Sequence, residues 1–350
     1  MRGKKEITIY DIAESLNLSS ATVSRGLKDH PAIRKETKKR ILAKAQEMGY
    51  RHNLFASNLR RNRTNTIGVI VPRLNSYFMS SVISGMEKVA SEAGYNLVIS
   101  QSLESEKKEI VNIKTMFNSR VDGLLVSLAY DTEDDSHFKM ILDKGIPLIF
   151  FDRVFEHPLC TSVVIDNYAA GYTMTQHLIQ QGCKRIVHIT ANVKRNVYAE
   201  RLRGYKQALT DHGILYDENL LFFNNLGETA CVEAVRTILQ MNPLPDAIFS
   251  SNDSSAVVCI RELKMAGIKI PQDMAIAGFN NEPVSTVIEP NLTTINYPGQ
   301  EMGEISASIL IRRLTKLEDE SLNRVVLRHQ LIVRNSSLRK HSNVINHISL

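Results

Sequence analysis

The chain has 350 residues, of which 43% are hydrophobic and 23% charged, and its formal net charge is +6. This length predicts two or three globular domains. The sequence contains no low-complexity tract and no apolar run long enough to span a bilayer, which argues against fibrous, disordered and membrane-spanning proteins.

The positive charge is concentrated at the start of the chain. Residues 1–66 hold 15 lysines and arginines against 6 acidic residues, whereas the remainder holds 28 against 31. A basic head on a mildly acidic body favours binding to a polyanion. A basic surface that is only solvated would carry the same charge. The helical pattern of these residues therefore has to distinguish a polyanion-binding head from a solvated surface.

Two features predict a cytoplasmic protein. The charged start, Met-Arg-Gly-Lys-Lys-Glu, has no apolar stretch behind it, which predicts the absence of a secretory signal. The four cysteines are far apart and lack CxxC spacing, which predicts buried free thiols in a reducing compartment; they are Cys160, Cys183, Cys231 and Cys259.

Three short helices are expected in residues 1–52. Thr8 can cap the first, and Asp11 in its first turn suits the helix dipole. Its apolar residues recur at helical spacing: Ile9, Ile12, Ala13 and Leu16. The turn falls on Asn17 and Leu18.

Ser19 or Ser20 can cap the second helix, whose inward residues are expected to be Ala21, Val23 and Leu27. The third helix, about Lys35 to Met48, has Ile41, Leu42 and Ala45 on one side, and Gly49 ends it.

Two short helices joined by a tight polar turn suit insertion of the second helix into the DNA major groove. This pattern resembles the lactose-repressor (LacI/GalR) family of transcription regulators, and the resemblance covers all but the last ten or so residues. It implies that the second helix is the recognition helix, with Ser20, Ala21 and Arg25 at base-contacting positions.

Arg25 could bridge guanine O6 and N7, although a phosphate contact or a surface salt bridge is the alternative. Thr22 and Ser24 are expected to hold phosphates. The candidate DNA-binding residues of the head are Thr8, Tyr10, Ser19, Ser20, Ala21, Thr22, Ser24 and Arg25.

Residues 53–65 resemble the family's hinge helix and its linker. The pattern Asn-x-x-Ala-x-x-Leu falls on Asn53, Ala56 and Leu59. The resemblance implies that two such helices insert their leucines into the minor groove and kink the duplex. His52 stands where the family usually has proline. The alternative is a plain linker with an incidental leucine.

From residue 66 the pattern changes to alternating strands and helices. Apolar runs occupy Ile67–Val71, Leu97–Ser100, Gly123–Val126, Leu148–Phe151, Val163–Ile165, Ile186–Ile189, Ala247–Phe249 and Ala275–Ala277. Helices are expected over Phe78–Ala93, Tyr168–Gln181, Ala199–His212 and Asp253–Ala266. This alternation predicts parallel sheets covered on both faces, in two doubly wound subdomains with a cleft between them.

This part also resembles periplasmic sugar-binding proteins. The predicted fold is thus an all-α helix-turn-helix head with a hinge helix, followed over residues 66–340 by a periplasmic-binding-protein-like α/β body. The resemblance implies that the chain crosses between subdomains near 165–168, 295–298 and 325–329. It also implies a small-molecule site in the cleft, where strand carboxyl ends meet.

The candidate effector-binding residues are Tyr77, Phe78, Asp152, Asp166, Arg195, Arg201, Asn252, Asp253 and Asn280. Arg201 matches the family's best-known ligand-binding arginine, whose guanidinium suits paired hydroxyls or a carboxylate. Asn280 stands where the family commonly has aspartate, which predicts a weaker bond to sugar hydroxyls.

Several of these residues have a purely structural alternative. Phe78 could belong to the core, Asp166 and Asp253 could cap helices, and Arg195 could be solvated.

No cofactor, metal or enzyme activity is expected. The sequence lacks GxGxxG after the first strand, a Walker A loop, HExxH, GxSxG and clustered Cys/His ligands. These absences disfavour an enzyme on a doubly wound sheet. The expected absence of a secretory signal and the basic head disfavour a free sugar-binding receptor.

The expected protein is a regulator that binds a near-palindromic double-stranded DNA operator and has no membrane partner. Repression is the family default, and activation stays open. A sugar-like effector is favoured over a purine co-repressor. The tail, residues 341–350, lacks apolar heptads, which predicts a homodimer without a tetramerisation coil.

Overall fold

The computed structural model describes residues 7–50, 63–316 and 323–339. These form two compact units, Met1–Thr64 and Asn65–Leu350, which we call the head and the body and describe separately.

In the residues that the structure describes, the head contains three helices, α1 (Ile9–Leu16), α2 (Ser20–Leu27) and α3 (Lys35–Glu47). Thr8 and Asp11 form a reciprocal capping box at the start of α1, and Ser19 caps α2 by accepting a hydrogen bond from the Thr22 amide. Asn17 ends α1 in the left-handed conformation, with φ of 51°, so that the chain reverses into α2 within three residues.

The head core is small. Ile12, Val23 and Ile41 are fully buried, one from each helix. Two expectations were wrong: Ala21 and Leu42 are exposed. Ala21 lies about 200° around α2 from Val23, and Leu42 about 100° around α3 from Ile41, so neither shares the buried face of its helix.

The first subdomain of the body is built on a six-stranded parallel sheet with the order β11-β5-β4-β3-β1-β2. Its strands are β1 (Thr66–Val71), β2 (Asn96–Gln101), β3 (Gly123–Val126), β4 (Leu148–Phe151), β5 (Thr161–Ile165) and β11 (Arg324–Leu327). Residues alternate between its faces: Val69 packs with α5 (Tyr77–Glu92) and α13 (Gly299–Leu314). Ile70 packs on the opposite face, with α6 (Glu106–Asn118) and α7 (Lys139–Asp143).

The second subdomain contains a four-stranded parallel sheet with the order β7-β6-β8-β9. Its strands are β6 (Ile186–Thr190), β7 (Leu221–Phe223), β8 (Ala247–Ser250) and β9 (Ala275–Ala277). One face carries α8 (Asn167–Gln180) and α9 (Asn196–Asp211), and the other carries α10 (Glu228–Leu239) and α11 (Asp253–Met265).

Smaller elements complete the body. Beside the second sheet lie the short helix α12 (Val284–Val287) and an antiparallel pair of strands, β10 (Thr294–Asn296) and β12 (Gln330–Ile332). Two 3₁₀ turns, η1 (Ser136–Phe138) and η2 (Glu218–Leu220), lie in connections.

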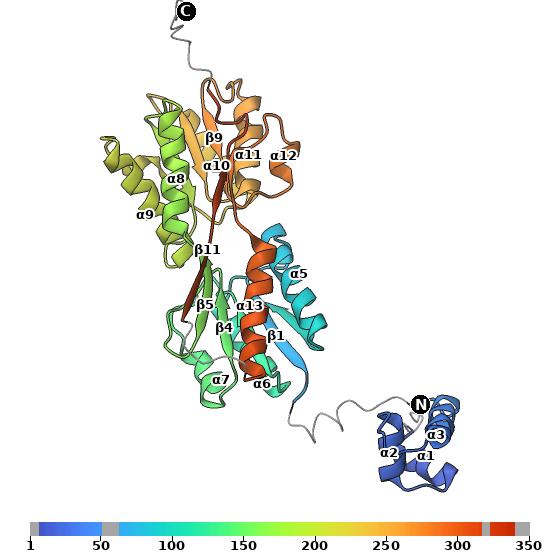
Figure 1. Ribbon diagram of the computed structural model, residues 1–350. Helices are drawn as coiled ribbons and strands as arrows, with labels where there is room; N and C mark the ends of the chain where they lie inside the picture. The colour runs from blue at the N-terminus through green and yellow to red at the C-terminus, as the bar shows by residue number, and fades with distance from the viewer. Residues whose placement is uncertain (1–6, 51–62, 317–322, 340–350) are drawn as a thin grey trace, which may run out of the picture. The chain divides into compact units, whose positions relative to one another are not determined.

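Three connections join the two subdomains (Figure 1). They run from β5 to α8, from β10 to α13 and from β11 to β12. Neither subdomain is therefore continuous in sequence.

Each subdomain contains one pair of helices in backbone contact. In the first, Gly85 of α5 lies against the Gln300 carbonyl and Gly303 of α13 lies against the Val82 carbonyl. In the second, Gly171 of α8 and Gly204 of α9 approach the partner backbone in the same way. A Cβ at any of these four positions would collide with main-chain atoms.

The predicted parallel sheets and their helical covering are confirmed, as are the buried free thiols. No helix within the described ranges is both long and apolar enough to cross a membrane. The same part of the chain holds no group of three His, Cys, Asp or Glu side chains suited to a metal ion.

Candidate functional site

In the head, α2 presents an outer surface of small and basic residues. Ala21 and Arg25 are exposed, and Ser20 and Ser24 are partly exposed on the same side. Thr8 and Ser19 are occupied as helix caps, and Thr22 shares a hydrogen bond with the Ser19 hydroxyl at 2.8 Å. Tyr10, 68% exposed, is available on α1.

Arg25 is the side chain of this surface with the longest reach. It makes no side-chain hydrogen bond or ion pair with the residues that the structure describes. Lys38, by contrast, is held by Asp29 at 2.6 Å. An exposed guanidinium without an internal partner is free to contact a base edge or a phosphate.

The hinge residues Asn53, Ala56 and Leu59 lie outside the described residues.

In the body, the loops after β3 and β4 meet the first turn of α9. Asn196 joins the loop after β4 to α9 at two points: its Nδ2 donates to the Asp152 carbonyl at 3.0 Å, and its Oδ1 accepts from the Val154 amide at 3.0 Å. The loop after β3 contacts α9 through the hydroxyls of Tyr130 and Tyr198. The contact brings strand carboxyl ends of the first subdomain against a helix of the second. This is where an open α/β sheet places a ligand.

Arg201, on α9, is 3% exposed. Its Nε donates to Asn167 Oδ1 at 2.8 Å, its Nη1 donates to the Ser251 carbonyl at 3.0 Å, and its guanidinium stacks on Phe279 with 3.5 Å to the ring centre. Burial lowers the pKa of Arg201. Its close packing follows from the Gly171 contact, which brings the α8 backbone against the Arg201 carbonyl.

Asp152 lies beside Arg201 and is 5% exposed. It accepts hydrogen bonds from the hydroxyls of Tyr297 and Ser127, and burial raises the pKa of this carboxyl group. Tyr297 in turn stacks on Phe78 with 4.2 Å between ring centres. Phe78 is therefore part of the packed core, and one of its faces is already covered.

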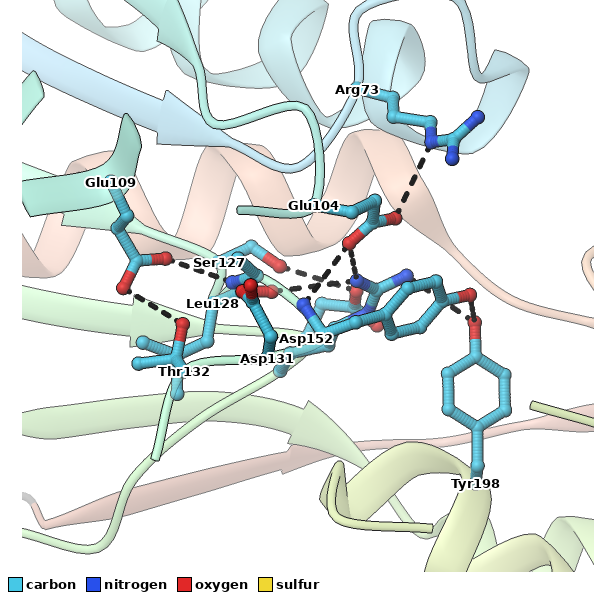
Figure 2. A network of polar contacts seen from close by, with 12 residues as sticks. Arg73, Glu104, Glu109, Ser127, Leu128, Asp131, Thr132, Asp152 and Tyr198 are labelled. Atoms are coloured by element: carbon cyan, nitrogen blue, oxygen red, sulfur yellow. Dashed lines mark hydrogen bonds and ion pairs between the residues drawn. The ribbon is translucent and has the colours of Figure 1, made fainter. Parts of the chain in front are cut away.

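Arg153, next to Asp152, spans the interface between the subdomains. Figure 2 shows two of the residues that it contacts, Glu104 of the first subdomain and Tyr198 of the second. Arg153 donates to Glu104 at 2.7 Å and to the Tyr198 hydroxyl at 3.3 Å, and it stacks on the Tyr130 ring. Tyr130 and Tyr198 share a hydrogen bond between their hydroxyls at 2.9 Å.

Arg195 is buried, with 4% exposed, and is not the solvated residue of the alternative interpretation. Its Nη2 donates to the Thr132 carbonyl across the interface. The Nε atoms of Arg195 and Arg153 are buried donors without an acceptor in the described structure. Each could donate to a ligand oxygen at little further desolvation cost.

Tyr77 and Asn280 do not join this buried group. Both line an outer pocket of about 430 Å³ with Asn281, Asn296 and Gln300. Asn280 has a φ of 109°, and its side-chain amide donates to Glu282. Tyr77 also lines a neighbouring pocket of about 400 Å³ with Ser254 and Glu282.

The remaining three candidates have structural contacts. Asp166 caps α8 and accepts from the Ala169 amide at 2.8 Å, and Asn252 caps α11 and accepts from the Ser255 amide at 2.7 Å. Asp253 is not the cap, because it is the first residue of α11. It is fully buried and accepts from Thr294 and the Glu282 amide, and burial raises its pKa to about 7.

The sequence analysis missed several residues of the interface: Glu104, Tyr130, Arg153, Asn196, Tyr198 and Tyr297. Arg153 directly follows Asp152, and Asn196 and Tyr198 lie between the two predicted arginines. Their proximity in sequence was an available signal, whereas Glu104 and Tyr130 follow strands without any motif around them.

The compact helical head, with its exposed second helix, is typical of a DNA-binding domain. The α/β body, with polar residues at the strand ends between two subdomains, is typical of a ligand-binding domain. Together they define a DNA-binding protein with a ligand-binding domain. Comparison with known protein families supports this class of protein. Residues 8–53 match the bacterial regulatory proteins of the lacI family, and residues 64–334 match the periplasmic binding proteins and sugar-binding domain of the LacI family.

The chain belongs to the LacI family of transcription regulators, which are DNA-binding regulators with an effector-binding domain and not enzymes. It is 32% identical to the transcriptional regulator RegA of Clostridium acetobutylicum, over 94% of this chain and 98% of that protein. It is 29% identical to catabolite control protein A of Priestia megaterium, over 95% and 99% of the two chains. Among solved structures, the CelR–cellobiose complex is 28% identical, with a TM-score of 0.72 over 95% of this chain and 100% of that one.

Proposed function

We propose that this regulator is a repressor that binds a near-palindromic operator as a homodimer and that a sugar-like effector controls it from the inter-subdomain cleft. The observation that carries the proposal is the outer surface of α2, where exposed Arg25 has no side-chain partner among the described residues. Ser20, Ala21 and Arg25 are the proposed base-reading residues, and Thr22 and Ser24 the proposed phosphate contacts.

The proposal includes a division of the chain into domains. Residues 1–52 form the DNA-binding domain, 53–65 the hinge helix and linker, 66–340 the effector-binding and dimerisation domain, and 341–350 a tail. Leu59 of the hinge is the proposed minor-groove wedge, together with Asn53 and Ala56 of the same motif.

Exposed apolar edges support a homodimer. The edge strand β2 exposes Val98 and Ile99, which are 42% and 40% accessible, and the edge strand β7 exposes Phe223, which is 55% accessible. Edge strands with apolar side chains are usually covered by a partner, and a two-fold dimer would cover the same edges on both copies.

A sugar-like effector is favoured by the donors of the cleft. Arg153 and Arg195 each keep a buried Nε without an acceptor, and a polyhydroxylated ligand offers many oxygen atoms. One solved relative is a complex of the transcriptional regulator CelR with cellobiose.

A purine is the second candidate, because Tyr77 is 53% exposed at an outer pocket and offers a free aromatic face. Phe78 is less available for such stacking because Tyr297 covers it.

The first experiment selects the full-length protein on fragmented genomic DNA from its source and sequences the retained fragments. We expect a few sites that share a palindrome and whose binding weakens steeply with salt, since phosphate neutralisation releases counterions. Retention without a shared site would contradict sequence-specific regulation and leave only polyanion binding.

A further inference from the structure

Three buried arginines form a group in the body, in which the charge of Arg153 acts on both Arg195 and Arg201. The three side chains are 7%, 4% and 3% exposed. Among the described residues they make a single ion pair, between Arg153 and Glu104 at 2.7 Å. Burial raises the pKa of Asp152, beside them, and so favours the uncharged form of that carboxyl group. The group therefore carries more positive charge than its contacts neutralise.

Arg195 has acidic residues in its neighbourhood but forms no ion pair with them in the described structure. Its Nη2 donates to the Thr132 carbonyl. Glu109 attracts Arg195 without contact, and its buried carboxylate accepts the Thr132 hydroxyl at 3.1 Å (Figure 2). Asp131 and Glu106 also attract Arg195, but both accept hydrogen bonds from backbone amides instead.

The electrostatic balance at Arg195 is unfavourable. Burial lowers the pKa of Arg195 and the positive charge of Arg153 lowers it further, and the neighbouring acidic residues offset these effects only in part. An arginine stays protonated in a protein, so this charge destabilises the folded body unless an anion neutralises it.

Two of the arginines also have an unused hydrogen-bond donor. The Nε atoms of Arg153 and Arg195 are buried and have no acceptor in the described structure. A neutral hydroxyl group could accept from them, but it would leave the charge of Arg195 without compensation. An oxygen of a carboxylate or phosphate group does both, and hydrogen bonds between charged partners are about twice as strong as neutral ones.

We propose that the effector carries an oxyanion, either a carboxylate or a phosphate group, which binds Arg195 and the Nε of Arg153. The effector is then an acidic sugar derivative and not a neutral sugar. This inference rests on the proposed function for the meaning of an effector. Anion binding itself is a property of the body and is measured without DNA.

The two outer pockets beside Tyr77 do not suit such a group. Their described lining residues include Glu282, Glu301 and Glu304 but neither lysine nor arginine. These carboxylates would repel an anion, so the buried arginines are the better place for it.

Inorganic phosphate is the first probe, because its binding does not depend on the shape of a sugar. Urea unfolding of the full-length protein in phosphate is compared with unfolding in chloride at equal ionic strength. We expect phosphate to raise the unfolding midpoint of the wild type, since a ligand of the native state stabilises it. Arg195→Gln should lose at least half of this increase, and what remains is the general effect of phosphate on protein stability.

Arg203→Gln is the matched control, because Arg203 lies on the same helix with its side chain 64% exposed. This variant should respond to phosphate as the wild type does. In chloride, Arg195→Gln should be at least as stable as the wild type, because it removes an unpaired buried charge. The proposal is overturned if phosphate does not stabilise the wild type, or if it stabilises Arg195→Gln equally.

Calorimetric titration of the wild type then distinguishes the two anionic groups. The probes are glucuronate and gluconate, which carry a carboxylate, glucose 6-phosphate, which carries a phosphate, and neutral glucose. We expect an acidic probe to bind at least tenfold more tightly than glucose, and the probe that does so identifies the group. Binding of glucose as tight as that of the acidic probes would contradict an anionic effector.

Selection of genomic DNA with the same preparation tests the proposed function separately. Failure of the wild type to retain any shared site would refute the proposed function, whereas the phosphate result would still stand.

Discussion

Arg25 is the residue of the head that we expect to contribute most to recognition of the DNA sequence. It lies on the exposed side of α2, five residues beyond the small Ser20 and four beyond Ala21. A guanidinium can donate two parallel hydrogen bonds to guanine, whereas neither of the smaller side chains can make such a contact. Discrimination between operators is thus expected to be concentrated at one base pair per half-site.

Arg25→Gln should reduce affinity for the selected operator by about 1–3 kcal/mol and relax the base preference at a single position. Titration of the operator and of duplexes with single base changes measures both effects. Lys39→Gln, an exposed lysine of α3, is the control and should weaken all duplexes alike. Equal losses on all duplexes with Arg25→Gln would show that Arg25 contacts only phosphate.

His188 is a buried titratable residue at the centre of the second sheet. Its Nδ1 donates to the Phe249 carbonyl at 3.0 Å, its Nε2 has no partner in the described structure, and its ring stacks between Tyr205 and Phe249. Burial lowers the pKa of His188 to about 4. The folded body therefore keeps this imidazole neutral where the unfolded chain would protonate it.

The body should become less stable as pH falls from about 6.5 to 4, because the unfolded state binds the extra proton in that window. His188 contributes up to about 3 kcal/mol to this loss. Urea unfolding of the wild type and of His188→Phe across this range tests the sign, and the variant should show the shallower dependence. If the stability of the wild type and of His188→Phe depended on pH in the same way, His188 would not be the cause of the loss of stability.

At the scale of single residues, the sequence predicted the role of a side chain correctly where its own chemistry determines that role. The caps Thr8 and Ser19 were predicted from their hydroxyls and are confirmed. It failed where the role depends on a distant partner. Arg153 acquires its position from Glu104, 49 residues earlier, and no local pattern contains that pairing.

At the scale of elements, apolar runs predicted eight strands, and all eight form. The four that were missed carry a weaker signal: β7 is partly exposed, β10 is three residues long, and β11 and β12 are largely exposed on edges. Exposure on an edge removes the continuous apolar run that identifies a buried parallel strand. Burial alone does not decide the outcome, because β2 is exposed on an edge but was predicted from its apolar run, whereas β10 is mostly buried but only three residues long.

The helix pairs depend on glycine at their crossing points. Gly303 of α13 lies directly against the Val82 carbonyl, so an added methyl group would have to separate α5 from α13. These helices cover one face of the first sheet, and their separation would disturb the core beneath them.

Gly303→Ala should lower the free energy of unfolding of the body by about 1–3 kcal/mol, the usual cost of overpacking, despite the better helix propensity of alanine. Chemical denaturation of the purified variant measures this. Ser91→Ala, on the exposed side of α5, should leave stability within about 0.5 kcal/mol. A neutral or stabilising Gly303→Ala would show that the helices can separate freely.

At the scale of the whole molecule, the chain forms two compact units, and the boundary between them in the sequence follows Thr64. Each has its own buried core: Ile12, Val23 and Ile41 in the head, and the sheet-centred clusters in the body. A unit with its own core is expected to fold without the other.

Deleting residues 1–62 should leave a folded dimeric body. Its unfolding midpoint should match the main transition of the full-length protein, and sedimentation should give the mass of two copies. Ile99→Lys tests the proposed dimer contact through the edge strand β2. We expect this variant to shift the body toward monomer, because it places a charge in that contact. Persistent dimers in that variant would place the interface elsewhere.

The three connections between subdomains also have a consequence for protein synthesis. Strand β5 is made early, yet its neighbour β11 begins at Arg324, and α13, which covers β3, β4 and β5, comes between them. At typical elongation rates, about 10–30 s separate the translation of β5 from that of β11. During that interval the nascent first subdomain lacks an edge strand and a covering helix, so most of the second subdomain, from α8 to β10, must leave the ribosome before the first can be completed.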